Sequence, residues 1–405
     1  MISTEQLYQI FKKHRSICTD SRRVSKDSIF FALKGDNFDG NAYAENALHL
    51  GCAYAVVDDP KVVSSDKFLL VKDALKALQD LAAFHRRTIK IPIVAITGTN
   101  GKTTTKELVS SVLAQKFRVI ATKGNMNNHI GVPLTILSMN HTTDMGIIEM
   151  GASHQGDIAE LCAIAQPDYG IITNVGKAHL EGFGSEEIIR KTKGELYDYL
   201  KQNNGVVFIN GESPTLISML GHYSGIKYGN TDDSFCTGKL TSKEMYVGIE
   251  WQCNDNSGLA ISNLIGDYNF ENILAAICLG NYFNISPTII DKTIGSYTPS
   301  NNRSQWVRGR RNHLILDFYN ANPTSMAIAI DNFMQYQAPK KCLILGDMLE
   351  LGNCSESEHQ QIISMINHVD YEDVFFVGEN FLQLKRNNPF LFFENVEMLN
   401  KYLAK

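Results

Sequence analysis

The chain has 405 residues, of which 44% are hydrophobic and 20% are charged, as in an ordinary globular protein of two or three domains. Its formal net charge of −5 at pH 7 provides no overall attraction for nucleic acid or an anionic membrane, so we expect neither as a partner. The first residues lack the pattern of a signal peptide, and no apolar run reaches membrane-spanning length. We therefore expect a cytoplasmic protein without membrane insertion, and a monomer.

The eight cysteines are scattered along the chain and form no C-x-x-C pair. This pattern favours reduced, mostly buried thiols over disulfides or a zinc site. The cysteines concerned are Cys18, Cys52, Cys162, Cys236, Cys253, Cys278, Cys342 and Cys354.

Residues 1–86 are predicted to form a small α/β domain with strands at 28–33 and 53–57 and helices at 42–50 and 73–86. The sequence then becomes basic before entering an apolar run. We place the first domain boundary near residue 87.

Two polar stretches of this domain lie beside strand-like segments and could bind an anionic ligand. C-T-D-S-R-R contains Asp20, Ser21 and Arg22, and K-G-D-N-F-D-G begins with Lys34. Such side chains hydrogen-bond nucleotides and sugars, and Arg and Lys favour phosphate. Polar turns with a surface ion pair would give the same pattern, so the residues alone leave both interpretations open.

The strongest functional signal is V-A-I-T-G-T-N-G-K-T-T-T at residues 94–105, between a predicted strand and a helical pattern at 106–115. Glycines let backbone N–H groups approach phosphate oxygens, and the helix N-terminus adds a partial positive charge. Lys102 is placed to reach terminal phosphates and Thr103 to ligate Mg²⁺, although the usual first glycine is replaced by Ile96. We therefore predict a phosphate-binding loop comprising Gly98, Thr99, Asn100, Gly101, Lys102, Thr103 and Thr104, which is compatible with an ATP-driven enzyme or a nucleotide-gated binding protein.

After this loop, strands and helices alternate, which predicts a mainly parallel sheet flanked by helices. The strand candidates are 117–121, 145–150, 169–173 and 205–209, followed by shorter, antiparallel-looking pieces at 234–240, 245–252 and 259–265. Ligands of parallel sheets bind at the carboxyl ends of the strands. Polar residues immediately after these strands are therefore candidates for chemistry.

Several polar residues occupy such positions, and each also has a simpler explanation. Asn127 and Asn128 could contact a ligand or form an asparagine-rich turn. Glu149 ends a strand and could ligate Mg²⁺, which takes oxygen ligands. His179 follows the next strand, but a lone histidine is more often a satisfied polar residue. Lys193 lies in a helical stretch whose lysines would ordinarily face solvent.

A further helix begins near residue 269, and its Asn272 could contact a base or ribose. From about residue 300 a second alternating unit follows, with strands at 314–318, 341–345 and 373–377. D-F-Y-N-A-N-P ends its first strand and supplies Asp317, Asn320 and Asn322. Arg303 and the arginines from 308 to 311 form a basic patch that could face phosphate or solvent.

Taken together, T-G-T-N-G-K-T-T, D-S-R with K-G-D-N-F-D-G, G-N-M-N-N-H-I-G-V-P, E-M-G-A-S-H-Q-G-D-I, A-H-L-E-G-F-G-S, D-F-Y-N-A-N-P-T-S-M and G-D-M-L-E-L-G resemble the Mur ligase family over nearly the whole chain. The resemblance implies an α/β fold of three domains. These are a small N-terminal α/β domain that binds a UDP substrate (1–86), a central P-loop ATPase-like domain with a mostly parallel sheet that binds ATP (87–299), and a C-terminal Rossmann-like α/β ligase domain (300–405).

Within the family, these motifs are most similar to the branch that joins D-alanyl-D-alanine to UDP-N-acetylmuramoyl-tripeptide during peptidoglycan precursor synthesis. The resemblance implies an ATP-dependent amide ligase that forms an acyl phosphate, with ATP and Mg²⁺ as cofactors. The family usually ends with a K-G-S-x-G loop that this sequence does not contain, so we expect either a shortened last domain or a loop supplied in another way. A catalytically impaired nucleotide-binding paralogue and a sister ligase with another amino-acid substrate remain open as alternatives.

The resemblance also implies roles for individual residues. Lys102, Lys193 and His179 would be catalytic, and Asn272 and Asp317 would contact adenosine. Thr103, Glu149, His179 and a carbamylated Lys193 would hold Mg²⁺, since carbamylation turns a cation into a carboxylate-like oxygen ligand. The substrates would be bound by Asp20, Ser21, Arg22, Lys34, Asn127, Asn128, Asn320 and Asn322.

Overall fold

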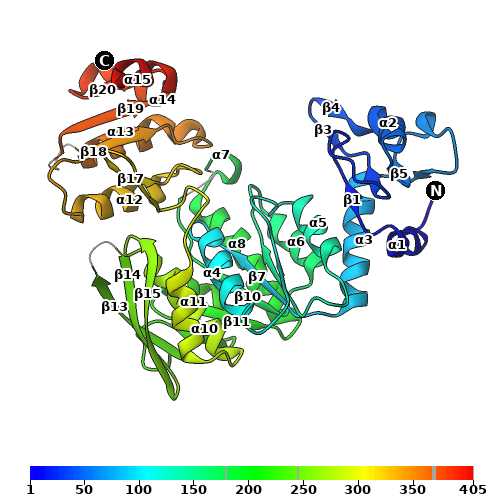
Figure 1. Ribbon diagram of the computed structural model, residues 1–405, viewed down its shortest axis with the longest axis horizontal. Coiled ribbons are helices and arrows are strands. Elements are labelled where there is room, and N and C mark those ends of the chain that lie inside the picture. Colours follow the sequence, from blue (N-terminus) through cyan, green and yellow to red (C-terminus); the bar gives the residue numbers. More distant parts are fainter. Residues whose placement is uncertain (178–179, 244–245, 367–370, 405) are drawn as a thin grey trace.

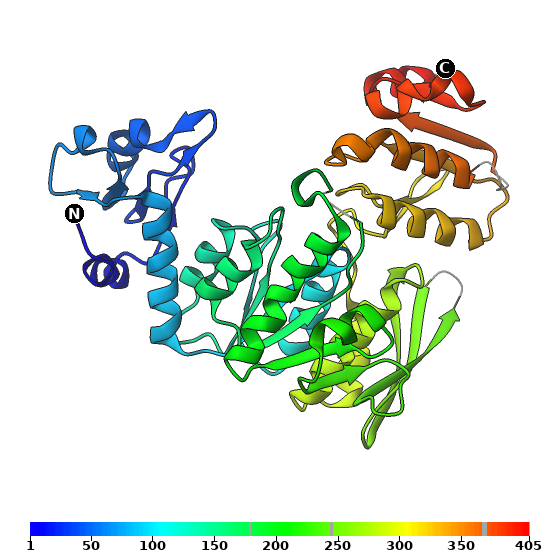
Figure 2. The same ribbon diagram turned by 180° about the vertical axis from the view of Figure 1, so that it is seen from behind.

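A computed structural model describes residues 1–177, 180–243, 246–366 and 371–404. Its elements gather into three successive α/β units, with the first and last on opposite sides of the central unit (Figure 1). The view from behind shows the same arrangement (Figure 2). The α/β class and three-part organisation predicted from the sequence are therefore confirmed. No helix in the described part of the chain combines the length and apolarity needed to cross a membrane.

The N-terminal unit is built on a four-stranded parallel sheet of order β1-β2-β5-β6. Its first helix begins with a capping box, in which Ser3 and Gln6 satisfy each other's backbone N–H groups. The elements are α1 (Thr4–Lys13), β1 (Ile17–Cys18), β2 (Ile29–Phe31), the β3 (Lys34–Gly35) and β4 (Phe38–Asp39) hairpin, α2 (Ala44–His49), β5 (Tyr54–Val57), β6 (Phe68–Leu70) and α3 (Ala74–Ile89).

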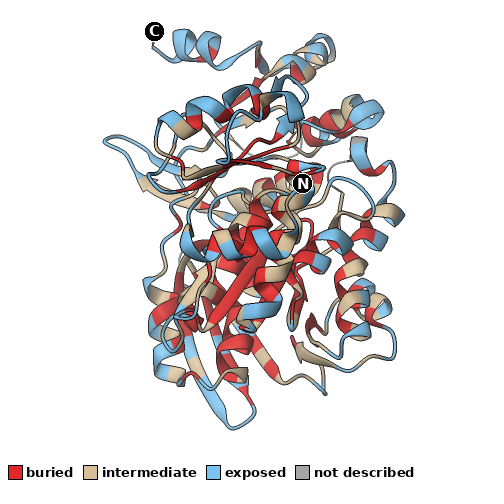
Figure 3. Cartoon of the chain, turned by 90° about the vertical axis from the view of Figure 1, so that its right-hand side faces the viewer, coloured by how far each residue is buried: buried red, intermediate tan, exposed pale blue. Residues whose placement is uncertain are grey.

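The central unit contains a nine-stranded sheet of order β15-β14-β13-β12-β11-β10-β7-β9-β8. Its strands from β12 to β8 are parallel, and β13, β14 and β15 add an antiparallel extension, as the sequence predicts. The strands β7, β9 and β10 are buried almost throughout, which Figure 3 shows as a red centre. Continuous apolar runs of this kind are typical of parallel strands in a sheet that helices cover on both faces.

Residues 93–296 supply the elements of this central unit. They are β7 (Ile93–Thr97), α4 (Lys102–Leu113), β8 (Val119–Ala121), α5 (Gly131–Ser138), β9 (Met145–Glu149), α6 (Asp157–Ala165), β10 (Tyr169–Ile172), α7 (Leu180–Phe183), α8 (Glu186–Gln202), β11 (Val206–Asn210), α9 (Pro214–Leu220), β12 (Gly225–Tyr228), β13 (Cys236–Lys243), β14 (Tyr246–Cys253), β15 (Asn256–Ile265), α10 (Asn269–Tyr282) and α11 (Pro287–Ser296).

One expectation about the cysteines is wrong. Cys236 and Cys253 form a disulfide, whereas we expected reduced thiols. They are direct register partners on the antiparallel strands β13 and β14, with Cα atoms 4.1 Å apart. Which cysteines face each other depends on the register of the two paired strands. The positions of the cysteines in the sequence do not give this register. The other cysteines are free, and Cys18, Cys52, Cys162 and Cys278 are buried as predicted.

The C-terminal unit has a three-stranded parallel sheet of order β18-β19-β20 beside a separate β16–β17 hairpin. Its core gathers apolar residues of α12, α13 and the parallel strands around Phe376. The elements are β16 (Gln305–Arg308), β17 (His313–Leu316), α12 (Pro323–Gln335), β18 (Cys342–Gly346), α13 (Ser355–Ile366), β19 (Asp373–Val377), α14 (Glu379–Gln383), β20 (Leu391–Phe393) and α15 (Val396–Leu403).

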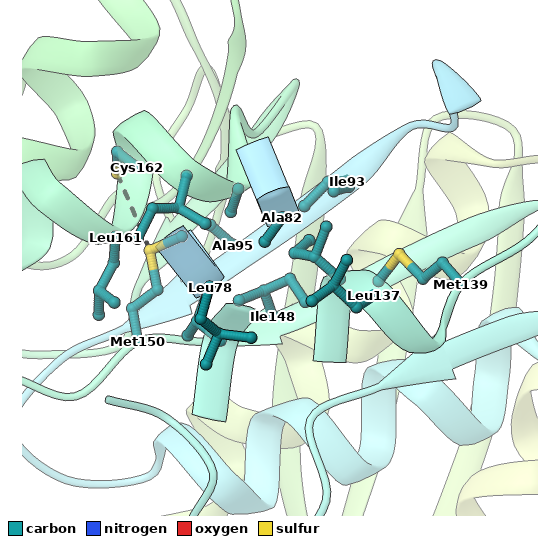
Figure 4. Packing of buried hydrophobic residues seen from close by; sticks show 14 of the residues in the cluster. Leu78, Ala82, Ile93, Ala95, Leu137, Met139, Ile148, Met150, Leu161 and Cys162 are labelled. Carbon is teal, nitrogen blue, oxygen red and sulfur yellow. Dashed lines mark hydrogen bonds between the residues drawn. The ribbon is translucent and has the colours of Figure 1, made fainter. Parts of the chain in front are cut away.

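Helix α3 joins the N-terminal unit to the central one through a shared apolar core. Figure 4 shows Leu78 and Ala82 of α3 lying against Ile93, Ala95 and Ile148 of the central sheet. The same core continues into α1 and β2 of the N-terminal unit. The predicted boundary near residue 87 falls inside α3 and remains a prediction, because the helix serves both units.

The end of α3 is fastened to the central unit by a buried guanidinium group. Arg86 donates from Nε to the carbonyl oxygen of Ala165, and from Nη2 to that of Gln166 and to the Asp168 carboxylate, each at 2.8 Å. Asp168 also accepts from the backbone N–H of Ile93, where β7 begins. One side chain thus ties α3 to the start of the strand that leads to the phosphate loop.

Replacing Arg86 by methionine should lower the free energy of unfolding by about 2 kcal/mol, because it leaves buried carbonyl groups without donors. The midpoint of urea denaturation would measure this loss. Arg87 is exposed, with its guanidinium carbon 5.9 Å from the ring centroid of Phe84, so Arg87→Met is the matched control and should shift the midpoint very little. Equal midpoints for the two variants would contradict the assignment.

Candidate active site

The phosphate loop lies between β7 and α4, as the sequence predicts, but α4 begins at Lys102, four residues before the predicted helix start. Gly98 has φ 142° and Gly101 has φ 80°, values that favour glycine. A Cβ atom at Gly98 would lie 2.0 Å from Oγ1 of Thr173, and one at Gly101 2.5 Å from Oδ1 of Asn272. Both glycines are therefore required by backbone conformation and by close packing.

The first N–H groups of α4 lack acceptors within the helix, and the N-cap residue Gly101 has no side chain to supply one. Such a helix start is a binding site for phosphate oxygens. Lys102 folds back over the loop, and its Nζ donates to the carbonyl oxygens of Gly98 and Thr99 at 2.8 Å. Burial lowers the pKa of Lys102 to about 8, opposed by Glu149 and reinforced by Arg303. Both side chains thus act electrostatically on the lysine of the loop.

Asn174, at the end of the neighbouring strand β10, holds the phosphate loop in shape. Its Oδ1 accepts from the N–H of Asn100 at 2.9 Å, and its Nδ2 donates to the carbonyl oxygen of Asn100 at 3.1 Å. Its own carbonyl oxygen accepts from the N–H of Thr99, and Thr173 Oγ1 donates to the carbonyl oxygen of Asn100. The loop is therefore preorganised by protein contacts that do not involve a ligand.

Glu149 ends β9, on the other side of β7, and is 1% exposed. Its Oε1 accepts from Asn127 Nδ2 at 2.8 Å, whereas its Oε2 has no hydrogen-bond partner among the described residues. A buried carboxylate oxygen without a partner is costly unless a cation or donor approaches it. The position beside the phosphate loop makes a bound cation the natural complement.

Lys193 projects from α8 and is 3% exposed. Burial is the main cause that lowers its pKa, to about 7, and the nearby charge of Lys102 lowers it further, while Asp157 and Glu195 raise it. Its Nζ lies 5.6 Å from the ring centroid of Phe183. Its environment is therefore a buried site close to Lys102, and the alternative of a solvent-facing lysine is wrong.

The C-terminal unit reaches the phosphate loop through polar contacts. Asn322 caps α12 with its Oδ1, and its Nδ2 donates to Oδ1 of Asn100 at 2.8 Å. Thr324 Oγ1 accepts from the backbone N–H of Lys177 at 3.3 Å, and the Nζ of Lys177 pairs with Glu358 at 3.3 Å. The predicted site residue Asn322 is thus brought to the loop from another unit.

Arg303 stands at the entrance to the C-terminal unit. Its guanidinium carbon lies 4.0 Å from the ring centroid of Tyr319, and its buried Nε has no hydrogen-bond partner in the described structure. Because its charge lowers the pKa of Lys102, it contributes to the positive potential at the loop. Together with Lys102 it makes this region suited to a polyanion.

Other predicted residues have partners within the protein. Asn272 lies behind the loop, where its Oδ1 accepts from Thr105 Oγ1 and its Nδ2 donates to Asn269. The Oδ1 of Asn128 accepts from the N–H groups of Ile130 and Gly131, in the turn that leads into α5. Asn128 therefore forms the structured turn that was the simpler interpretation of its motif.

Asp317 and Asn320 follow β17 and are exposed. Asn320 accepts from the N–H of Ala321. The predicted residue His179 lies outside the described residues.

The candidates in the N-terminal unit share one edge of its sheet, because β1 and β2 are parallel neighbours. Asp20 accepts from Arg22 at 2.9 and 3.0 Å, and this pairing lowers the pKa of Asp20 to about 2. Lys34 pairs with Asp58 at 2.8 Å. Ser21 lies in the same turn as Asp20 and Arg22. The surface ion pair considered from the sequence is thus present, and it leaves Arg22 largely exposed to a ligand.

Comparison with known proteins now decides the family. Residues 13–86 match the model "Mur ligase family, catalytic domain", residues 96–280 the "Mur ligase middle domain", and residues 302–389 the "Mur ligase, glutamate ligase domain". The chain is 34% identical to UDP-N-acetylmuramoyl-tripeptide–D-alanyl-D-alanine ligase of Bacillus subtilis, over 90% of this chain and 80% of that protein. The chain belongs to the Mur ligase family. The Haemophilus influenzae protein of the same name is 36% identical, over 93% of this chain and 85% of that protein.

Solved Mur ligase structures have the same three-unit fold. MurF from Acinetobacter baumannii superposes with a TM-score of 0.89 at 27% identity, covering 99% of this chain and 91% of that one. MurF ligase from Thermotoga maritima, solved in complex with ADP, gives a TM-score of 0.86 at 29% identity, covering 96% of this chain and 91% of that one.

Asn174 was not singled out from the sequence, and Arg303 was assigned no specific role beyond its membership of a basic patch. Asn174 follows a predicted strand at the ligand-facing edge, so its position was a usable signal. From the sequence, Arg303 was visible only as part of a basic patch, and its electrostatic effect on Lys102 depends on the tertiary structure. Two residues so far apart in the sequence form no local pattern from which their interaction could be predicted.

Asn174→Ala should weaken binding of an adenine nucleotide at least about tenfold, because the backbone groups of Asn100 lose the side chain that pairs with both of them. Isothermal titration calorimetry with ADP would measure the change. Asn125→Ala alters an exposed asparagine of another loop and should bind ADP as the unmodified protein does. Unchanged affinity in Asn174→Ala would show that the loop does not need this clamp.

Proposed function

We propose that this Mur ligase is a UDP-N-acetylmuramoyl-tripeptide–D-alanyl-D-alanine ligase, which uses ATP to join the dipeptide to the UDP-linked tripeptide in peptidoglycan precursor synthesis. The identity to proteins of that name, over 90% of the chain or more, supports this assignment. The main structural support for the assignment is the cluster of Lys102, Lys193 and Glu149 near the phosphate loop, in which one carboxylate oxygen of Glu149 has no hydrogen-bond partner among the described residues. We place the reaction in the cytoplasm, with the protein acting as a monomer.

The chemistry requires two anions to meet. An oxygen of the tripeptide's terminal carboxylate attacks the γ-phosphorus of ATP, an O–P bond forms, and the bond to the β-phosphate oxygen breaks to release ADP. The dipeptide amine then attacks the carbonyl carbon of the acyl phosphate and a C–N bond forms. The amine loses a proton to solvent, and the bond between the carbonyl carbon and the phosphate oxygen breaks to release phosphate. Lys102 and Arg303 offset the repulsion between carboxylate and triphosphate during the first step.

The residues present fit a magnesium ion. Glu149 offers a buried carboxylate oxygen that has no partner in the described part of the chain, and Thr103 stands at the start of α4 with 5% exposure. Oxygen donors of this kind suit Mg²⁺. His179 is proposed as a further ligand by family resemblance alone. Bound there, Mg²⁺ would supply positive charge to the transferring phosphoryl group.

Lys193 is proposed to act as a carbamate. Carbon dioxide reacts with a neutral amine, and a pKa of about 7 leaves much of this side chain neutral at physiological pH. The lost proton and the added carboxylate oxygens change a repelled cation near Lys102 into an attracted anion. Carbamylation would therefore remove a like-charge conflict and provide another oxygen ligand.

The N-terminal unit is proposed to bind the UDP moiety with Asp20, Ser21, Arg22 and Lys34, where the exposed Arg22 offers a donor for phosphate. Asn127, Asn128, Asn320 and Asn322 are proposed for the peptide and dipeptide side of the site. Asn272 and Asp317 are proposed near adenosine, in line with the resemblance.

Lys102→Ala should reduce ADP release that depends on both UDP-N-acetylmuramoyl-tripeptide and D-alanyl-D-alanine by at least about 100-fold, because charge stabilisation at the transferred phosphoryl group is lost. Lys123→Ala removes an exposed lysine and should retain full turnover. Mass spectrometry of the product, with several amines offered in parallel, identifies the acceptor. A product with another amine only, or none with any amine, would overturn the proposal.

Enzyme equilibrated with ¹³C-bicarbonate should give a carbamate NMR signal that disappears in Lys193→Met and persists in Lys191→Met, whose lysine is exposed and paired with Glu187. Activity supported by the carbamate should increase as pH rises through 7, since only the deprotonated amine reacts and acid returns it to the ammonium form. A wild-type spectrum identical to that of Lys193→Met would refute carbamylation.

A further inference from the structure

Lys106 is buried to 1% exposure inside the central unit, an unusual position for a lysine. It lies one helical turn after Lys102 on α4, so both lysines are on the same side of the helix. Its Nζ donates to the carbonyl oxygen of Thr122 at 2.7 Å and pairs with Glu107 Oε1 at 2.8 Å. Lys106 has no part in the chemistry proposed above, so its burial requires another explanation.

Thr122 continues this contact towards the site. It follows β8, and its N–H donates to the carbonyl oxygen of Ile147 on β9. Its Oγ1 accepts from the backbone N–H of Glu149 at 3.0 Å. Lys106, Thr122 and Glu149 thus form a chain of hydrogen bonds from the phosphate-loop helix to the strand end that carries the half-satisfied carboxylate.

This chain connects the two elements whose relative position matters most. Thr103 is at the first turn of α4, and Glu149 is at the end of β9. Groups that share one metal ion must be held to within about half an ångström, which requires support from the residues behind them. An apolar side chain at position 106 could fill the same space, but it could not donate to the carbonyl oxygen of Thr122.

We propose that Lys106 and Thr122 are positioning residues that fix Glu149 relative to the first turn of α4 and thereby set the affinity of the site for a divalent cation. This inference rests on the proposed function, since it takes Thr103 and Glu149 as ligands of the same ion. Lys106 does not touch substrate in this arrangement. It acts through the Thr122 carbonyl, and Thr122 acts through the N–H of Glu149.

The test is direct binding of Mn²⁺, as a paramagnetic substitute for Mg²⁺, to the full-length protein with saturating ADP, followed by electron paramagnetic resonance. Thr122→Val keeps the shape of the side chain but removes the hydroxyl acceptor, and Thr122→Ser restores it. We expect Thr122→Val and Lys106→Met to weaken Mn²⁺ binding about 10–100-fold, the usual effect of removing a supporting partner of a ligand. Thr122→Ser should bind within about twofold of the unmodified protein.

Glu107→Gln is the matched control for Lys106. It removes the partly exposed partner of the ammonium group while leaving the hydrogen bond to Thr122, and its Mn²⁺ affinity should not change. If Lys106 acts through Thr122, the double variant Lys106→Met/Thr122→Val should bind no more weakly than the weaker single variant. Fully additive losses would overturn this route.

Two results separate this inference from the function on which it rests. Wild-type protein that binds no Mn²⁺ with ADP and makes no amide product would overturn the proposed function. Wild-type protein that binds Mn²⁺ normally, beside a Thr122→Val variant that has a lower melting temperature but the same Mn²⁺ affinity, would overturn only the positioning role. If Lys106→Met does not fold, the Mn²⁺ affinity of Thr122→Val still tests the positioning role.

Discussion

The carboxylate of Glu149 is the constraint on which the site depends. It is buried, one oxygen is held by Asn127, and the other has no partner among the described residues. A charge in this position is destabilising unless cations lie close to it. Lys102 interacts with it from the phosphate loop, and a metal ion would complete its coordination. This destabilising burial of a carboxylate occurs at the sheet edge where phosphate would bind.

The parallel central sheet gathers these charges without help from sequence proximity. Strand β7 leads into the phosphate loop, and its neighbours β9 and β10 end with Glu149 and the loop of Asn174. Because parallel strands end at the same edge, residues far apart in the sequence meet there, such as Asn100 and Asn174, which are 74 positions apart. The lowered pKa values of Lys102 and Lys193 are consequences of this crowding and burial.

The outer units are attached to the central unit in different ways. The N-terminal unit shares an apolar core with it through α3, and Arg86 fastens the end of that helix. At the phosphate loop, the C-terminal unit makes polar contacts such as Asn322 with Asn100 and Lys177 with Glu358. Polar contacts of this kind are replaced easily by water or ligand, which favours motion near residue 300 over motion near residue 87.

The sequence by itself determined the phosphate loop, the alternation of strands and helices, and the family, because glycine spacing, apolar periodicity and continuous motifs are local properties. It also made Glu149 a candidate for the site by its position at a strand end, and the family resemblance added Lys193 as a second candidate. Only the tertiary structure decided that Lys193 is buried near Lys102, that the charge of Arg303 acts on Lys102, and that Cys236 pairs with Cys253. Only the tertiary structure showed that hydrogen bonds connect Lys106 through Thr122 to Glu149. Burial, strand register and the placement of one unit against another join residues far apart in the chain, and no local pattern encodes those distances.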